Sequence, residues 1–237
     1  MKARASLTNP IFVALDVDTP EQALALVRQT RAFVGGFKVG PRLALRYGEP
    51  LLKEISRHGQ MFIDNKYFDI PSTMESAVRA SFEMGAAFCT VHAQAGLESL
   101  IRLAKLEEEL CQLRPFRILA VTVLTSFRQE TLSPVSQAMP ISEQTLKLAQ
   151  LAIDSGLSGL VCSPDEVETL RRQHPAAFLV TPGVRLRRDD HGDQSRVSDP
   201  LTALRRGSSA LVVGRPIYQS LEPALAAKTY YEEIQKA

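Results

Sequence analysis

Short apolar runs alternate with longer segments of helical period along the whole chain, an alternation typical of a parallel sheet with crossover helices. Several runs are apolar on both faces, as is expected of strands buried inside a barrel. Because eight such units follow one another, we expect an α/β protein, a (β/α)8 TIM barrel that uses residues 1–237 as a single domain. The expected strands are Ile11–Asp16, Gly36–Gly40, Met61–Lys66, Ala87–His92, Ile118–Leu124, Gly159–Cys162, Phe178–Thr181 and Ala210–Val213.

Proline and glycine mark the expected helix boundaries between these strands. Proline near a first turn indicates three helix starts, at Thr19-Pro20-Glu21, Pro71-Ser72-Thr73 and Ser163-Pro164-Asp165-Glu166. Glycine indicates the ends of four helices, at Gly35, Gly59, Gly85 and Gly156. Between the last two strands, residues 183–198 are polar, charged and interrupted by glycine, and a long polar loop in a compact domain is usually functional.

The composition narrows the class of protein. With 45% hydrophobic and 23% charged residues among 237, the chain has enough apolar material for a large core. Its 28 Lys and Arg against 26 Asp and Glu leave a net charge of +2, which is too balanced for binding nucleic acid through bulk charge. Apolar stretches are too short to cross a membrane, and three cysteines without CxxC spacing indicate neither disulfides nor a zinc site. We therefore expect a cytoplasmic protein that binds neither nucleic acid nor membrane.

Polar residues follow nearly every expected strand. In a (β/α)8 barrel the active site lies at the carboxyl ends of the strands, so these residues should share one mouth. They are Asp16, Lys38, Asp64 with Lys66, His92, Thr125 with Ser126, Ser163, Gly183 with Arg185, and Gly214 with Arg215. Charges buried at one end of a barrel are costly unless they pair, and the signs here allow pairing. The pattern indicates a site.

The densest group of charges lies in residues 64–73, DNKYFDIPST. Asp64 and Lys66 are two residues apart on a strand, so their side chains should share the face toward the barrel mouth. Asp69 lies beyond the strand, in the turn before Pro71. A lysine flanked by carboxylates stays protonated and can act as an acid rather than as a Schiff-base nucleophile. The alternative is a solvated turn with a surface salt bridge, but the strand-end position and Lys38 argue for a site.

A second group of residues indicates an anion site. Loops after strands 7 and 8 of such barrels often bind phosphate through glycine N–H groups and a helix N-terminus. The segments concerned are Thr181–Arg185, Gly192-Asp193-Gln194 and Val212–Ile217. Arg215 adds a charged donor fork and Gln194 a neutral donor, so we expect a phosphate monoester as substrate. In the simpler alternative, Gly214 only turns the chain and Arg215 is a surface charge.

Other chemistry finds little support in the sequence. His92 follows the fourth strand, where a hydrogen-bonded structural histidine is more common than a catalytic base. No H-E-x-x-H, dinucleotide fingerprint or Walker motif occurs, so zinc, NAD and ATP are not indicated. Cys89 and Cys162 lie in apolar strands and are expected in the core.

In this order, the motifs resemble those of the orotidine 5'-phosphate decarboxylase family over essentially the whole chain. The matching segments are Ala14-Leu15-Asp16, Phe37–Gly40, DNKYFDIPST, Val91–Gly96, Val121–Ser126, TPGVR, GDQSRV and VVGRPI. The family pattern D-x-K-x-x-D-I-x-x-T is met by Asp64, Lys66, Asp69, Ile70 and Thr73. Two departures are Asn65, where many relatives have a hydrophobic residue, and HAQAG in place of H-A-x-G-G.

The resemblance implies a (β/α)8 lyase without cofactor or metal that converts orotidine 5'-monophosphate to UMP and CO2 in de novo pyrimidine synthesis. Lys66 would give the proton to C6 of the pyrimidine, and Asp64 would lie beside the departing carboxylate. The catalytic set would be Lys66, Asp64, Lys38 and Asp69. The substrate-binding set would be Asp16, Lys38, Asp69, Ile70, Thr73, Thr125, Ser126, Arg185, Gln194, Gly214 and Arg215.

The implied roles divide the binding set by substrate group. Gln194, Gly214 and Arg215 would hold the phosphate, with Arg185 at the base of a closing loop, residues 184–198. Ser126 would face the base. Lys38 and Asp16 would bind the ribose or complete the charge network, together with Asp69 and Thr73 of the other subunit in a homodimer.

Two alternative functions remain open. The first is a Mg²⁺-dependent sugar-phosphate decarboxylase or aldolase, which shares the D-x-K-x-x-D core but lacks the I-P-x-T continuation and the GDQ of the loop. The second is a catalytically silent barrel that binds a nucleotide as a sensor. A binder has no need of a carboxylate facing an anionic ligand, so the acid–lysine–acid array argues against the second.

Overall fold

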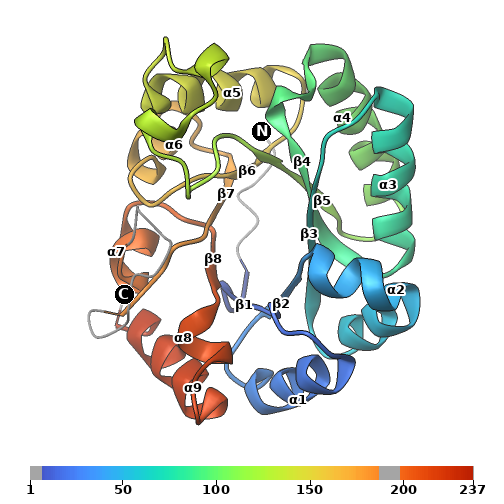
Figure 1. The fold of residues 1–237 in the computed structure, drawn as a ribbon, viewed down its shortest axis with the longest axis vertical. Helices are drawn as coiled ribbons and strands as arrows, with labels where there is room; N and C mark the ends of the chain where they lie inside the picture. Colours follow the sequence, from blue (N-terminus) through green and yellow to red (C-terminus); the bar gives the residue numbers. More distant parts are fainter. Residues whose placement is uncertain (1–6, 187–197, 237) are drawn as a thin grey trace.

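Eight parallel strands close into a barrel in the computed structural model, which describes residues 7–186 and 198–236 (Figure 1). Each strand pairs with the next one along the chain, and the eighth returns to pair with the first. The strands are β1 (Ile11–Ala14), β2 (Gly36–Val39), β3 (Gln60–Tyr67), β4 (Ala86–His92), β5 (Arg117–Val121), β6 (Gly159–Val161), β7 (Phe178–Thr181) and β8 (Ala210–Val213). The expected (β/α)8 barrel is confirmed.

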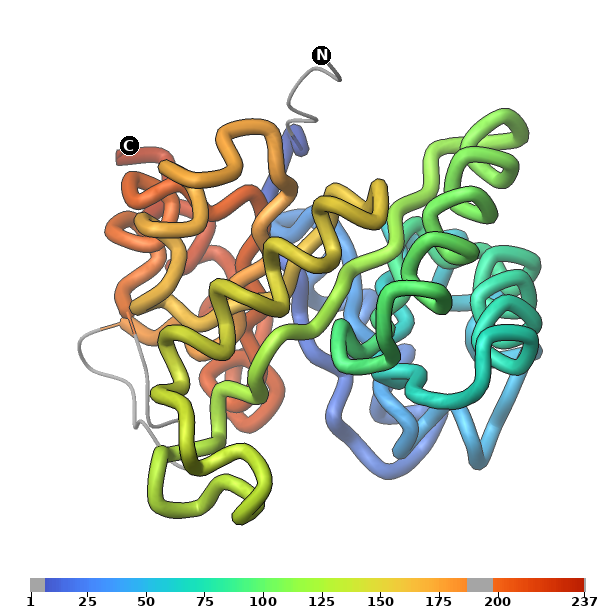
Figure 2. Tube along the Cα trace, turned by 90° about the horizontal axis from the view of Figure 1, so that it is seen from above, coloured from blue at the N-terminus to red at the C-terminus, as the bar shows by residue number. Residues whose placement is uncertain are grey.

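Helices surround this barrel on the outside (Figure 1). They are α1 (Pro20–Thr30), α2 (Pro41–Ser56), α3 (Pro71–Glu83), α4 (Leu97–Cys111), α5 (Ile141–Asp154), α6 (Val167–Gln173), α7 (Pro200–Arg205), α8 (Arg215–Tyr218) and α9 (Pro223–Ile234), with three 3₁₀ turns, η1 (Ala93–Ala95), η2 (Gln129–Thr131) and η3 (Pro134–Ser136). Figure 2 shows the long segment between β5 and α5, in yellow-green, extending beyond the barrel on the side opposite the N-terminus.

Two of the three expected helix starts are confirmed. α1 begins after Thr19, whose side chain accepts a hydrogen bond from the Gln22 amide in a capping box, and α3 begins at Pro71. The third expectation is wrong, because α6 begins only at Val167. The Glu166 carboxylate accepts hydrogen bonds from the Ser163 amide (2.7 Å) and the Thr145 hydroxyl (3.3 Å). These bonds hold the preceding residues in a turn instead of a first helical turn.

Alternation along the strands divides the apolar side chains into two groups. One set packs between the strands and the helices, as Ile11 and Val13 of β1 do. The other set fills the inside of the barrel and includes Phe12, Phe62, Phe88 and Phe178. The rings of Phe12 and Phe88 meet edge to face at 5.5 Å, while those of Phe88 and Phe178 stack at 5.4 Å. The rings leave no space for a water molecule, so they close the barrel from below.

Candidate active site

A cavity of about 330 Å³ opens at the carboxyl ends of the strands. Its floor is apolar and includes Phe62 of the ring cluster, and charged residues line its walls. The lining residues are Ala14, Asp16, Lys38, Phe62, Asp64, Lys66, Val121, Val123, Leu124, Thr125, Val161, Val180, Pro182, Gly183, Arg185, Val212, Gly214, Arg215 and Tyr218. Eight residues of the expected catalytic and substrate-binding sets therefore share one cavity: Asp16, Lys38, Asp64, Lys66, Thr125, Arg185, Gly214 and Arg215. Gly183, expected at the same mouth, lines it too.

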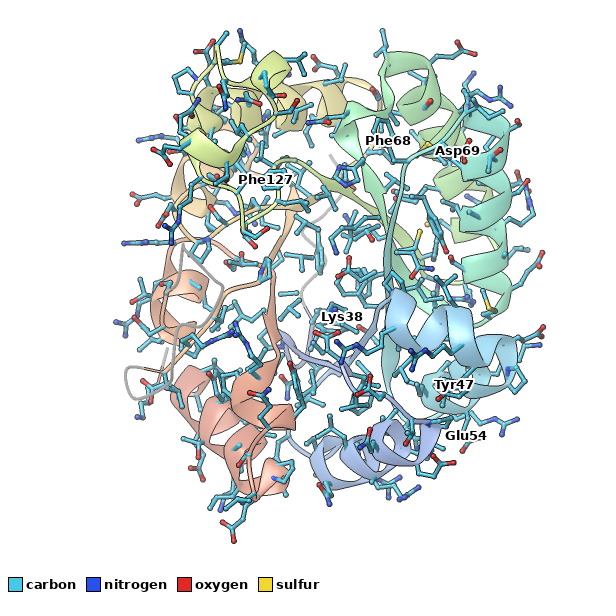
Figure 3. The ribbon with its side chains drawn as sticks, in the orientation of Figure 1. Lys38, Tyr47, Glu54, Phe68, Asp69 and Phe127 are labelled. Atoms are coloured by element: carbon cyan, nitrogen blue, oxygen red, sulfur yellow. The ribbon has the colours of Figure 1, made fainter. Side chains whose placement is uncertain are left out.

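Carboxylates and ammonium groups alternate along one wall of this cavity. Lys38 lies 3.3 Å from Asp16 and 3.3 Å from Asp64, so its ammonium bridges the ends of β1 and β3. The other oxygen of Asp64 lies 2.9 Å from the ammonium of Lys66. Lys38 points into the barrel mouth in Figure 3. Both oxygens of Asp64 are thus engaged by cations, which compensates for the cost of burying the array.

The alternation shifts the pKa of the two most buried members. Burial acts to raise the pKa of Asp64, but the charges of Lys38 and Lys66 and hydrogen bonds from Lys66 and Thr90 outweigh it, so this pKa is lowered. Burial acts to lower the pKa of Lys38, but Asp64 and Asp16 outweigh it, so this pKa is raised. Both groups are therefore ionised at neutral pH.

The pKa of Asp64 predicts how the stability of the protein depends on pH. Because the folded pKa lies below the ordinary value of 3.8, ionised Asp64 contributes stability above that value, and the contribution is lost as the pH falls through the folded pKa. The free energy of unfolding, measured in urea, should therefore differ between wild type and Asp64→Asn by the same amount at about pH 7 and about pH 5.5. Toward about pH 3 the wild type should lose stability relative to the variant. A difference that stays constant down to about pH 3 would contradict the assignment.

The backbone at Lys66 is not that of a regular strand. Lys66 has a φ of 50°, the one positive φ among the described non-glycine residues, and the pairing of β3 with β4 shifts register between Ile63 and Tyr67. Such a conformation costs about 1–2 kcal/mol for a residue with a Cβ. The side chains of Asp64 and Lys66 are neighbours, as expected. Strand alternation alone does not bring them together, because the bulge at Lys66 also contributes.

Thr90 of β4 is a site residue that the sequence analysis did not identify. Its hydroxyl accepts a hydrogen bond from the Lys66 amide (2.9 Å) and donates one to Asp64 (3.0 Å). Thr90 therefore holds the bulged backbone and the carboxylate together from the neighbouring strand. In the sequence, the one sign of this role was that Thr90 is a polar residue inside the apolar run AAFCTVH, two positions before the strand ends at His92.

Cationic and glycine residues that follow β7 and β8 form another part of the cavity lining. Arg215 follows Gly214 at the start of the single turn α8, and Arg185 lies just after β7. Arg185 is buried, and its guanidinium donates to the Val184 carbonyl (2.7 Å). The loop that begins here is closed at its base, because the Arg185 amide donates to the Ser198 carbonyl (3.0 Å). Residues 187–197, with Gln194, lie outside the described part of the chain.

Four residues of the expected catalytic and substrate-binding sets do not line the cavity of their own chain, and neither do His92 and the buried Ser163 of the strand-end residues. Asp69, Ile70, Thr73 and Ser126 are all exposed. A carboxylate oxygen of Asp69 accepts a hydrogen bond from the Ile70 amide (2.6 Å) in the link between β3 and α3. Phe68 and Asp69 occupy this link next to the barrel mouth in Figure 3. Phe68 and Ile70 are 60% and 64% exposed, which is unusual for large apolar residues.

His92 lies at the edge of the site. Its ring packs against Phe68, with 5.7 Å between ring centroids, and does not line the cavity. Burial, and next the charge of Lys66, lower the pKa of His92, while Asp64 acts in the opposite direction. The imidazole is therefore neutral at pH 7. Its buried Nδ1 has no hydrogen-bond partner among the described residues, so the expected hydrogen-bonded structural role is not confirmed.

Metal-binding clusters and membrane-spanning helices are both absent from residues 7–186 and 198–236. In this part of the chain, no three or more His, Cys, Asp or Glu residues are grouped so that they could hold a metal ion. None of its helices has both the length and the apolar character needed to cross a membrane. The two expected core cysteines, Cys89 and Cys162, are buried.

Comparison with known proteins gives consistent matches. The family model "Orotidine 5'-phosphate decarboxylase / HUMPS family" matches residues 9–230. The orotidine 5'-phosphate decarboxylase of Pseudomonas aeruginosa (strain LESB58) is 39% identical over 227 residues, which are 95% of this chain and 97% of the relative. The protein of that name from Haemophilus influenzae (strain 86-028NP) is 41% identical over 220 residues, or 92% and 95% of the two chains. The crystal structure of orotidine 5'-phosphate decarboxylase from Lactobacillus acidophilus superposes with a TM-score of 0.82 at 31% identity, covering 95% of this chain and 99% of that one.

Proposed function

Because the chain belongs to the orotidine 5'-phosphate decarboxylase / HUMPS family, we propose that it decarboxylates orotidine 5'-monophosphate to UMP and CO2 in pyrimidine biosynthesis. The observation that carries this proposal is the alternating array of Asp16, Lys38, Asp64 and Lys66 in the wall of a cavity of nucleotide-binding size. A buried anion beside a buried ammonium suits a reaction in which negative charge moves from a carboxylate to a neighbouring carbon.

In the proposed mechanism, the bond between C6 and the carboxylate breaks and its electron pair stays on C6. CO2 leaves, and the ammonium of Lys66 gives its proton to C6, after which the lysine regains a proton from solvent. Asp64 faces the departing carboxylate and orients Lys66, because the two side chains lie 2.9 Å apart. Lys38 balances the charge of Asp64 from the other side, at 3.3 Å.

The proposed phosphate site is the cationic wall formed by Arg185, Gly214 and Arg215, with Gln194 from the loop 184–198. The guanidinium of Arg215 supplies a planar fork of donors, which matches the oxygens of a phosphate monoester. Ser126, after β5, is assigned to the base and Thr125 to the substrate-binding set, while Asp16 and Lys38 bind the ribose or complete the charge network.

Arg215→Ala should impair the phosphorylated substrate and leave the phosphate-free nucleoside almost unaffected, because the lost donors have no partner there. Loss of a charge-assisted bidentate contact costs about 1.5–3 kcal/mol or more, so kcat/KM for the nucleotide should fall about ten- to hundredfold. Steady-state kinetics with both substrates measure this. Arg57→Ala, which removes an exposed arginine paired with Glu54, is the control. Equal losses on nucleotide and nucleoside would place Arg215 outside the phosphate site.

We also propose that the active unit is a homodimer in the cytoplasm and that Asp69 and Thr73 serve the site of the neighbouring subunit. The support is local: both residues are exposed and stand beside the exposed apolar residues Phe68 and Ile70. Leu97, at the start of helix α4 next to α3, is also exposed, at 52%. Apolar surface of this kind is typical of a protein interface.

The proposed function is tested by mixing the purified protein with orotidine 5'-monophosphate after treatment with EDTA and following the loss of the orotidine absorbance band. Conversion to UMP at the same rate with and without EDTA treatment supports the proposal. Activity that requires added Mg²⁺, on a sugar phosphate instead, would favour the metal-dependent alternative. Tight nucleotide binding without turnover would favour the sensor.

A further inference from the structure

Behind β3, on the side away from the cavity, a chain of hydrogen bonds connects the two sequence neighbours of Lys66 to helix α3. The Asn65 amide nitrogen lies 3.0 Å from the Tyr67 hydroxyl, which lies 2.8 Å from the hydroxyl of Ser81. The Ser81 hydroxyl in turn lies 2.8 Å from the Ala77 carbonyl. Neither Asn65 nor Tyr67 lines the cavity, so none of these bonds is part of the site already described.

The number of hydrogens available fixes the direction of every bond in this chain. The Ala77 carbonyl can only accept, so the hydroxyl hydrogen of Ser81 points to it. Ser81 must therefore accept from the Tyr67 hydroxyl, and Tyr67 must accept from the amide of Asn65. Each group donates onward to the next, an arrangement in which neighbouring hydrogen bonds strengthen one another.

This chain of hydrogen bonds lies beside the irregular part of the β3 backbone, at Lys66. A residue that departs from regular geometry persists only when its surroundings hold it there from more than one side. On the mouth side, Thr90 accepts a hydrogen bond from the Lys66 amide. On the helix side, Asn65 and Tyr67 are bonded to each other across Lys66 and fixed to the fully buried Ser81.

We propose that Asn65, Tyr67 and Ser81 are positioning residues for Lys66, which hold its backbone in the bulge so that its ammonium stays against Asp64. The inference rests on the proposed function, since it assigns these residues to the reaction of Lys66. Asn65 acts through its amide nitrogen, because its oxygen accepts no hydrogen bond from any described residue. An apolar residue would avoid that unsatisfied oxygen, so the hydrogen bond to Tyr67 is the physical reason for a polar group here.

Tyr67→Phe tests the proposal directly, because it removes the central hydroxyl and keeps the ring. We expect kcat for orotidine 5'-monophosphate to fall about tenfold or more with KM nearly unchanged, since a small misplacement of a catalytic group impairs chemistry more than binding. Tyr231→Phe, which removes a hydroxyl from a half-buried tyrosine of α9, is the matched control and should keep the wild-type kcat. An equal kcat in wild type and Tyr67→Phe would overturn the proposal.

Two further variants separate positioning from general stability. Asn65→Leu should retain the melting temperature of the wild type and still lose kcat. Ser81→Ala should lower kcat, whereas Ser155→Ala, which removes an equivalent bond from a buried serine to the carbonyl four residues earlier, should not. The kcat of the double variant Tyr67→Phe/Ser81→Ala should be no lower than that of the slower single variant, because both substitutions interrupt the same chain of hydrogen bonds. If the loss of kcat follows the loss of melting temperature in all variants, controls included, the hydrogen bonds have only a structural role and the proposal is overturned.

Hydrogen exchange supplies a readout that does not depend on catalysis. The Lys66 amide is bonded to Thr90, so its exchange rate in the free protein reports on the bulge itself. Exchange at Lys66 should be faster in Tyr67→Phe than in wild type and unchanged in Tyr231→Phe. If the wild type shows no decarboxylation, the proposed function fails, and the exchange rate of the Lys66 amide alone tests the positioning role. An unchanged exchange rate in Tyr67→Phe would then refute the positioning role.

Discussion

Lys66→Ala should eliminate decarboxylation while the barrel remains folded. In the proposed mechanism the variant lacks the proton donor and leaves Asp64 with only one of its two cations. General acid catalysis contributes about 10²–10⁴-fold, and the loss of the ammonium that stabilises the carbanion adds to this, so kcat should fall by at least that range. The loss of orotidine absorbance measures turnover, and circular dichroism with UMP binding verifies the fold.

The control for this variant is Lys147→Ala, an exposed lysine of α5 paired with Glu143, which should retain wild-type turnover. Turnover in D2O provides the companion measurement, because protonation of a carbanion at C6 requires deuterium at that position of UMP. A Lys66→Ala variant that keeps more than a few per cent of activity, or UMP without deuterium, would reject the assignment of the donor.

Mixing Lys66→Ala with Asp69→Ala chains should restore activity that neither variant has alone. If each site combines Lys66 of one chain with Asp69 of the other, a mixed dimer has one doubly damaged site and one intact site. Random exchange at equal amounts makes about half of the dimers mixed, so about a quarter of all sites should work. Activity measured against time after mixing should rise to that level as subunits exchange.

The control mixture combines Lys66→Ala with Asp64→Ala. These two residues lie 2.9 Å apart in one chain, so every site in a mixed dimer lacks one of them and no activity should appear. If the mixture with Asp69→Ala also stays inactive after exchange is complete, Asp69 serves its own chain. That result would remove the intersubunit site while leaving the fold and the Lys66 mechanism in place.

The sequence predicted well what depends on periodicity within one segment. β7 and β8 have the expected bounds, and Gly85 and Gly156 adopt positive φ values of 93° and 99° at helix ends, as the glycine pattern indicates. β5 ends three residues earlier than expected, at Val121. Val123 and Leu124 instead line the cavity, and an apolar run cannot distinguish a buried strand from a buried wall.

Contacts between distant segments were harder to predict from the sequence. Thr90 reaches Lys66 from the next strand, and Glu166 shapes the start of α6 through Thr145 in another helix. Their partners lie 21 or more positions away, beyond the range of any local pattern. Asn65 stood out in the sequence only as a departure from the family pattern. Its bond to Tyr67 depends on the bulge at Lys66, which alternation alone does not predict.

The four phenylalanine rings inside the barrel determine how small molecules can travel to and from the reaction. Phe12, Phe62, Phe88 and Phe178 leave no water-sized space, so the described packing offers no route along the barrel axis. In the proposed reaction, CO2 formed beside Asp64 must then leave through the mouth, past the nucleotide that fills it. Bulk water must enter by that same route. A proton delivered to the pyrimidine during turnover would therefore come from the side chains of the cavity, and solvent would reprotonate them only after the nucleotide departs.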